Sequence, residues 1–97
     1  MTENKIITFD GNTLLVQTRK YTNNRTAIEL IDTEDHMPYI IATVNIPTSS
    51  IEEDEVIIKD YSENQGIYDV LVKAGVISES IRQINAGFAN ALICKLL

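Results

Sequence analysis

The chain has 97 residues, with 14 acidic against 8 basic side chains and a formal net charge of −6. This length predicts a single compact domain, residues 1–97. The hydrophobic content of 44% is ordinary for a folded protein and excludes intrinsic disorder. The acidity argues against direct binding of nucleic acid or of an anionic membrane, because both would repel it.

The sequence also bears on membrane spans, secretory signals and disulfides. No stretch reaches the roughly 18 apolar residues that cross a bilayer. The start of the chain, MTENK, lacks the basic and apolar pattern of a secretory signal. The single cysteine, Cys94, excludes an internal disulfide framework and fits a reducing compartment. The sequence therefore predicts a cytoplasmic protein.

Two β-rich runs open the chain, Lys5–Phe9 and Thr13–Thr18. The residues between them include Asp10–Gly11, and Asp-Gly is a strong hairpin signal because glycine tolerates the positive φ of such turns. We expect a β-hairpin here. The polar segment Arg19–Arg25 that follows contains Asn23–Asn24, which indicates a loop.

A second hairpin is predicted from Thr26–Ile31 and Tyr39–Ile46, joined by the polar turn Asp32–Met37. The second of these runs alternates as a strand should, because its apolar residues fall on one face. That face carries Ile40, Ala42, Val44 and Ile46. A connection then leads to a short strand, Glu55–Lys59.

One helix is predicted, over Ser62–Ala74. Ser62 and Gln65 have the spacing of a capping box, in which each side chain bonds a free backbone N–H. Gly75 stands where a glycine ends a helix in the left-handed conformation. The apolar stripe of the helix is expected to pack on the sheet residues Ile40, Ala42, Val44, Val56 and Ile58, and it consists of Ile67, Val70, Leu71 and Ala74.

The end of the chain fits two structures. Ser78–Gln83 suits a helical turn or a strand. In Phe88–Leu97, Leu92, Cys94 and Leu96 alternate as in a strand, whereas Leu92, Ile93, Leu96 and Leu97 equally form a helical stripe.

Acidic residues are concentrated in one part of the sequence. From Glu29 to Asp69 there are eleven acidic residues and one basic residue, Lys59, which gives this segment a charge of −10. Apart from Glu29 and Asp69, these acidic residues fall into three groups. They lie in the predicted hairpin turn, in the connection between strands and at the start of the predicted helix. They form a candidate acidic face for binding a partner: Asp32, Glu34, Asp35, Glu52, Glu53, Asp54, Glu55, Asp60 and Glu63.

This acidic segment has two interpretations. Carboxylates in loops and at strand edges keep a small β-rich protein from pairing with its neighbours. Alternatively, they converge on one face, imitate the phosphates of nucleic acid and bind a basic protein by fast, salt-dependent association.

The sequence gives little support for a catalytic or metal-binding site. The only histidine, His36, lies in a polar turn, and Cys94 lies in an apolar run, so a Cys–His pair is disfavoured. The segment Asp32–Asp35 lacks the glycine and the distal glutamate of a calcium loop, and Glu52–Glu55 lacks its alternating spacing. No glycine-rich phosphate loop is present. The sequence predicts no catalytic residues, no metal site and no cofactor.

A resemblance covers residues 13–97, and its clearest part is Val56–Ile67, VIIKDYSENQGI. This motif resembles one in small uncharacterised proteins of bacterial phages, plasmids and conjugative elements, which are grouped as a domain of unknown function. The resemblance implies a compact α+β domain from a mobile genetic element and favours a final strand over a helix. It implies no activity and no catalytic residues, and Asp60 and Asn64 flank the helix start as turn and capping residues would.

The sequence therefore predicts an α+β domain in which an antiparallel, curved sheet of five to seven strands packs against one main helix. The leading functional hypothesis is a non-enzymatic accessory protein of a mobile element that binds another protein, in its most specific form an inhibitor of a host nucleic-acid-binding or defence protein. A small enzyme or ligand-binding domain with a cleft near the helix start is the alternative. A self-associating structural protein, seen as a two-fold dimer through an open sheet edge, is the third interpretation.

Overall fold

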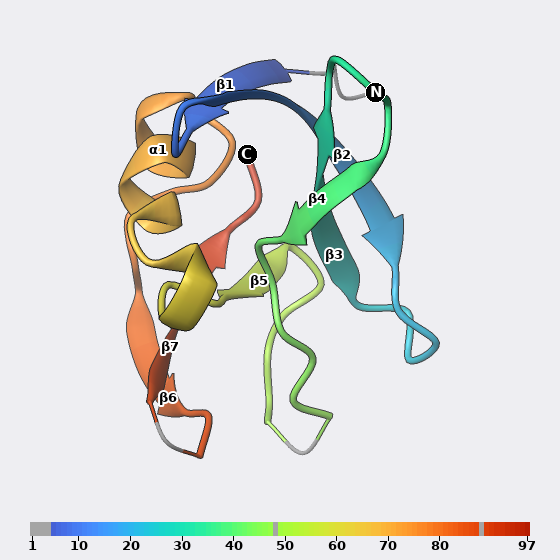
Figure 1. Ribbon diagram of the computed structural model, residues 1–97. Helices are drawn as coiled ribbons and strands as arrows, with labels where there is room; N and C mark the ends of the chain where they lie inside the picture. Colours follow the sequence, from blue (N-terminus) through green and yellow to red (C-terminus); the bar gives the residue numbers. More distant parts are fainter. Residues whose placement is uncertain (1–4, 48, 88) are drawn as a thin grey trace.

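A computed structural model describes residues 5–47, 49–87 and 89–97. The chain is α+β, as predicted, but its strands form two small antiparallel sheets (Figure 1). The first has the order β1-β2-β3-β4, with β1 at Lys5–Phe9, β2 at Asn12–Lys20, β3 at Thr26–Asp32 and β4 at Pro38–Ile41. The second has the order β5-β7-β6, with β5 at Glu55–Ile58, β6 at Arg82–Asn85 and β7 at Asn90–Lys95.

The first hairpin forms where Asp-Gly predicts it. Asp10 and Gly11 both have positive φ, 57° and 80°, as a two-residue turn of type I′ requires. Phe9 and Asn12 close the turn as paired residues. The second hairpin also forms, with the turn between Asp32 and Pro38.

The expectation of a single sheet fails at the end of β4. The predicted strand to Ile46 ends at Ile41, because the chain then crosses from the first sheet to the second. The N–H of Ala42 still donates to the carbonyl of Ile28 at 2.8 Å, whereas the N–H of Val44 donates to the carbonyl of Ile57 at 3.0 Å. Apolar residues continue to alternate through this crossing, but Ala42 packs in one hydrophobic core and Val44 in another.

The larger core lies between the inner face of the first sheet, one face of the second sheet and the helix α1, Ile67–Lys73. Its fully buried side chains include Leu14, Leu30, Ile58 and Leu71. A smaller core covers the other face of the second sheet, where Ile57, Ala91 and Ile93 are buried. Val44 packs there and not beneath the helix, which corrects the predicted packing at this residue.

The helix is shorter than predicted, and its start differs. Ser62–Asn64 forms a separate 3-10 turn, η1, and Ser62 and Gly66 both have positive φ, 56° and 98°. These conformations interrupt a continuous helix from Ser62, so the predicted capping box does not form. Asp60 takes its place, because its Oδ1 accepts the N–H groups of Gly66 and Tyr68, both at 3.0 Å.

The helix ends as predicted, in a Schellman motif at Gly75. The N–H of Gly75, whose φ is 75°, donates to the carbonyl of Val72, and the N–H of Val76 donates to that of Leu71. In the tail, β7 confirms the strand alternative for the last segment, whereas residues 78–81 form neither a strand nor a helical turn and β6 begins only at Arg82; Phe88 lies outside the described residues. Among the described residues, none of the helical segments has the length and apolar character needed to span a membrane.

Candidate functional site

The acidic residues predicted to form a binding face lie in three separate places (Figure 1). The turn between β3 and β4 is at the upper end of the first sheet, the segment before β5 runs below it, and η1 lies beside the second sheet. Folding therefore distributes the three groups over the molecule. Each group also has a local structural role.

In the β3–β4 turn, two carboxylates hold the backbone. Asp32 Oδ1 accepts the N–H of Glu34 at 2.8 Å, and Asp35 Oδ1 accepts that of Met37 at 2.9 Å. Such contacts stabilise tight turns. Glu34 and Asp35 are exposed, so their charges remain accessible to a partner.

In the second group, Glu52–Glu55, two of the four carboxylates form ion pairs with basic side chains. Glu55 is buried and forms an ion pair with Arg82 at 3.1 Å. The Arg82 guanidinium, together with the N–H of Glu52, lowers the pKa of Glu55 below its ordinary value. Asp54 pairs with Lys95 at 3.0 Å, which raises the pKa of that lysine. Glu52 and Glu53 are exposed and line a hollow of about 320 Å³ opposite the basic loop of Lys20 and Arg25.

The third group is divided between two roles. Asp60 caps the helix start, as described above. Glu63 is exposed and accepts from Lys59 Nζ at 2.8 Å, a contact that lowers the pKa of Glu63. The same lysine lies 5.8 Å from the ring of Tyr61.

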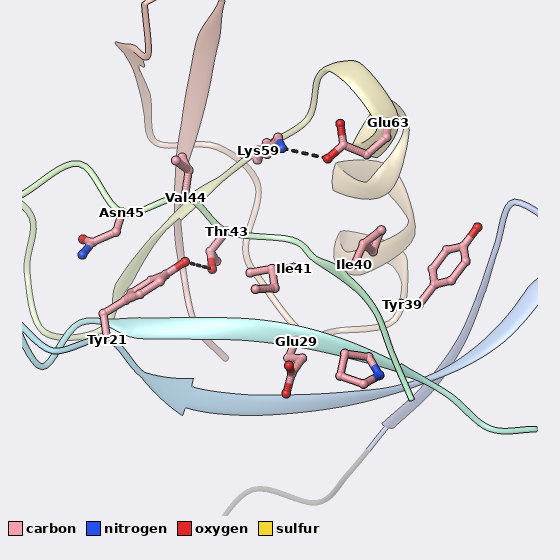
Figure 2. Close-up of a pocket in the computed structure, with 11 residues that line it drawn as sticks. Tyr21, Glu29, Tyr39, Ile40, Ile41, Thr43, Val44, Asn45, Lys59 and Glu63 are labelled. Carbon is pink, nitrogen blue, oxygen red and sulfur yellow. Dashed lines mark hydrogen bonds and ion pairs between the residues drawn. The ribbon is translucent and has the colours of Figure 1, made fainter. Parts of the chain in front are cut away.

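An open groove of about 610 Å³ runs along β4 (Figure 2). Ile41 lies in its middle, with Tyr39 towards one end and Asn45 towards the other. The hydroxyl of Tyr21 bonds Thr43 Oγ1 at 2.9 Å and supports the end near Asn45. The lining comes from six parts of the chain: Tyr21, Glu29, Pro38–Ile41, Thr43–Asn45, Lys59 and Glu63.

Exposed apolar side chains gather at this groove. The described residues include six large apolar side chains that are well exposed, and three of them, Met37, Tyr39 and Ile41, lie within five consecutive positions. Ile41 is 47% exposed and stands opposite Glu29, which is itself buried and paired with Arg19 at 3.2 Å. An exposed apolar patch with a polar rim is typical of a surface that binds another molecule.

The ionisable side chains that line the groove are all engaged in ion pairs or hydrogen bonds. Its lining contains neither a cysteine nor a histidine, and both of its carboxylates, Glu29 and Glu63, are engaged in ion pairs. Cys94 lies in the larger core, where burial raises the pKa of its thiol to about 11 and keeps it protonated at neutral pH. His36 is exposed in the β3–β4 turn. Within the described part of the chain, no three His, Cys, Asp or Glu side chains gather as metal ligands would.

Comparisons of the chain with known protein families, with curated proteins and with solved structures found no match. The site therefore has to be interpreted from its own geometry. Of the predicted acidic residues, only Glu63 lines the groove, and Glu34 and Asp35 belong to the turn that leads into β4. Tyr21, Glu29 and Ile41 were not predicted. One signal could have indicated Ile41: it and Tyr39 are apolar at the strand positions that alternate with Ile40 and Ala42, where a half-buried strand usually carries polar residues. We find no such signal for Tyr21 or Glu29.

Proposed function

We propose that the protein is a non-enzymatic accessory protein that acts by binding another protein through the groove along β4. The observation that carries this proposal is the concentration of exposed apolar side chains at Met37, Tyr39 and Ile41 beside that groove. Aromatic and methionine side chains are enriched in protein interfaces, where a few well-packed side chains carry most of the binding energy.

The charges around the groove favour a basic partner. Glu34 and Asp35 are exposed in the turn that precedes β4, and Glu63 lines the groove itself. Lys59 already pairs with Glu63, so unpaired negative charge dominates the end of the groove near the turn. A segment with apolar and basic side chains would therefore complement both the shape and the charge of the site.

An origin in a bacterial mobile element follows only from the resemblance of the Val56–Ile67 motif. Inhibition of a nucleic-acid-binding or defence protein is the more specific form of the proposal. In that form, the β3–β4 turn would supply the charge that imitates phosphate, since it is the acidic group next to the groove. The groups at Glu52–Glu55 and at Asp60 support this form less, because they hold structural contacts.

The rival interpretation, a ligand-binding domain or enzyme, required a deep pocket at the helix start around Asp60, Tyr61 and Glu63. The groove along β4 is open and is lined by Glu63 but by neither Asp60 nor Tyr61. The capping contacts of Asp60 explain its presence without a ligand. We therefore favour the binding function.

A comparison of two matched variants tests this proposal. Ile41 in the groove and Ile81 outside it are 47% and 48% exposed, so Ile41→Lys and Ile81→Lys introduce the same charge at equal exposure. In pull-downs from a bacterial lysate at low salt, the wild-type protein and Ile81→Lys should retain the same basic proteins, and Ile41→Lys should lose them. Equal retention by both variants, or the recovery of no basic protein by the wild type, would contradict the proposal.

A further inference from the structure

The first sheet has two edges, and the edge at β4 is blocked against pairing with another strand. Pro38 has no N–H to donate. The register of β4 with β3 shifts between Leu30 and Ile31, which indicates a bulge. The carbonyl of Ile41 already accepts a bond of 2.8 Å from Asn64 Nδ2, a side chain that is almost fully buried. Prolines and bulges are the usual means by which proteins prevent pairing at an edge.

The opposite edge, β1, has none of these features. Its five residues pair with β2 in unbroken register, from Lys5 with Val16 to Phe9 with Asn12, and none of them is a proline. Ile6, in the middle of this edge, is 62% exposed. The contrast between the two edges indicates that β1 is kept open for pairing.

The turn geometry shows which backbone groups face outwards. In a two-residue hairpin the residues that close the turn exchange both of their hydrogen bonds, so Phe9, and Ile7 two positions before it, direct their N–H and carbonyl groups towards β2. The backbone groups of Ile6 and Thr8 then point away from the sheet.

Room for an added strand exists beside this edge. A shallow hollow of about 340 Å³ lies between β1 and α1, and among the described residues that line it Lys73 alone is charged. The apolar part of the lining comes from Ile6 and Ile7 on the strand and from Val70 and Ala74 on the helix. The helix thus leaves one side of β1 accessible and offers apolar surface next to it.

Charge makes a second copy of this chain a suitable occupant. The charged residues at the two ends of this edge, Lys5 and Asp10, have opposite signs, so an antiparallel pairing of two copies places unlike charges near each other. In an antiparallel two-fold pairing about Ile7, Ile6 of one copy lies opposite Thr8 of the other, and Lys5 lies opposite Phe9, next to Asp10. Lys5 Nζ donates to the carbonyls of Ala74 and Gly75 and keeps a third donor for that aspartate.

We propose that the protein forms a two-fold dimer in which β1 of one copy pairs antiparallel with β1 of the other, so that the first sheet continues across the two-fold axis into an eight-stranded sheet. This dimer leaves the groove along β4 accessible, since β4 is the opposite edge of the sheet. The dimer and the proposed binding function can therefore be tested independently of each other.

Sedimentation velocity over a micromolar to millimolar concentration series tests the dimer. The mass should rise from 10.9 kDa towards twice that value. Thr8→Pro removes an outward N–H without removing a β1–β2 hydrogen bond, and it should weaken the dimer by about tenfold or more, because symmetry removes the bond twice. Thr8→Val keeps the N–H and should dimerise like the wild type.

Asp10→Asn, which preserves the positive φ of the turn, should weaken the dimer and reduce its sensitivity to salt. A wild-type mass that stays at 10.9 kDa throughout would overturn the proposal. It would also be overturned if Thr8→Pro, shown to be folded by circular dichroism, dimerised as strongly as Thr8→Val. A dimer abolished by Ile41→Lys and untouched by Thr8→Pro would place the interface at β4 instead.

Discussion

The start of the helix allows a sharp test of the fold, because sequence and structure assign its capping to different residues. The capping box predicts that Ser62 supports the helix, whereas the structure gives this role to Asp60, two residues earlier. Asp60 Oδ1 accepts two backbone N–H groups at 3.0 Å, from Gly66 and Tyr68. Removing this oxygen leaves two donors at the helix start without their partner.

We expect Asp60→Ala to lower the free energy of unfolding by about 1–2 kcal/mol, the upper part of the range for lost caps, because two bonds are lost. For a domain of this size each kcal/mol shifts the melting temperature by roughly 4–8 °C. Asp60→Asn keeps the accepting oxygen and loses only the charge, so it should cost less than about 1 kcal/mol. Ser62→Ala should change stability by no more than about 0.5 kcal/mol, as exposed residues usually do.

Urea denaturation of the three variants, followed by circular dichroism, measures these differences directly. The order of destabilisation should be Asp60→Ala, then Asp60→Asn, then Ser62→Ala. If Ser62→Ala costs as much as Asp60→Ala, the helix begins where the sequence predicted, and the structural account of this segment fails.

Three further predictions follow from the cores and the ion pairs. Leu71→Ala, in the larger core, should lower the free energy of unfolding by about 2–5 kcal/mol in the same assay, and an unchanged midpoint would refute its packing. Glu55→Gln should cost about 1–3 kcal/mol at neutral pH. Because folding lowers the pKa of Glu55, its contribution to the free energy of unfolding is complete above the ordinary pKa of 4.5 and is lost as the pH falls through the pKa of the folded state. The stabilities of the wild type and of Glu55→Gln should therefore become equal in acid. A cost that is independent of pH would refute this role. The Cys94 thiol, with its pKa raised to about 11, should react with a disulfide reagent at pH 8 only after unfolding, and rapid labelling of the folded protein would contradict its burial.

Local signals in the sequence were sufficient for the turns and caps that depend on backbone conformation. Asp10–Gly11 and Gly75 adopt the positive φ that their positions predicted, since few residues tolerate it. The alternation in β7 likewise corresponds to a strand, with Cys94 buried and Lys95 exposed. These features depend on neighbours in the sequence.

Features that depend on distant contacts were not predictable in the same way. Alternation shows that Ala42 and Val44 face inwards, but it cannot show that they enter two different cores. Asp60 caps a helix that begins seven residues later, because Ser62 and Gly66 turn the chain back through positive φ.

The candidate site also depends on contacts between residues that are distant in the sequence. Composition identified the acidic residues, but the groove is assembled from segments as distant as Tyr21 and Glu63.

The central claim is that the groove along β4 binds a segment with basic and apolar side chains. A titration of ¹⁵N-labelled protein with a synthetic peptide of alternating lysine and valine, followed by amide chemical shifts, tests it most directly. The account predicts salt-sensitive shifts at Tyr39, Ile41, Thr43 and Lys59, which Ile41→Lys abolishes and Ile81→Lys leaves in place. Shifts confined to Glu52–Asp54, or the absence of shifts at millimolar peptide, would contradict it.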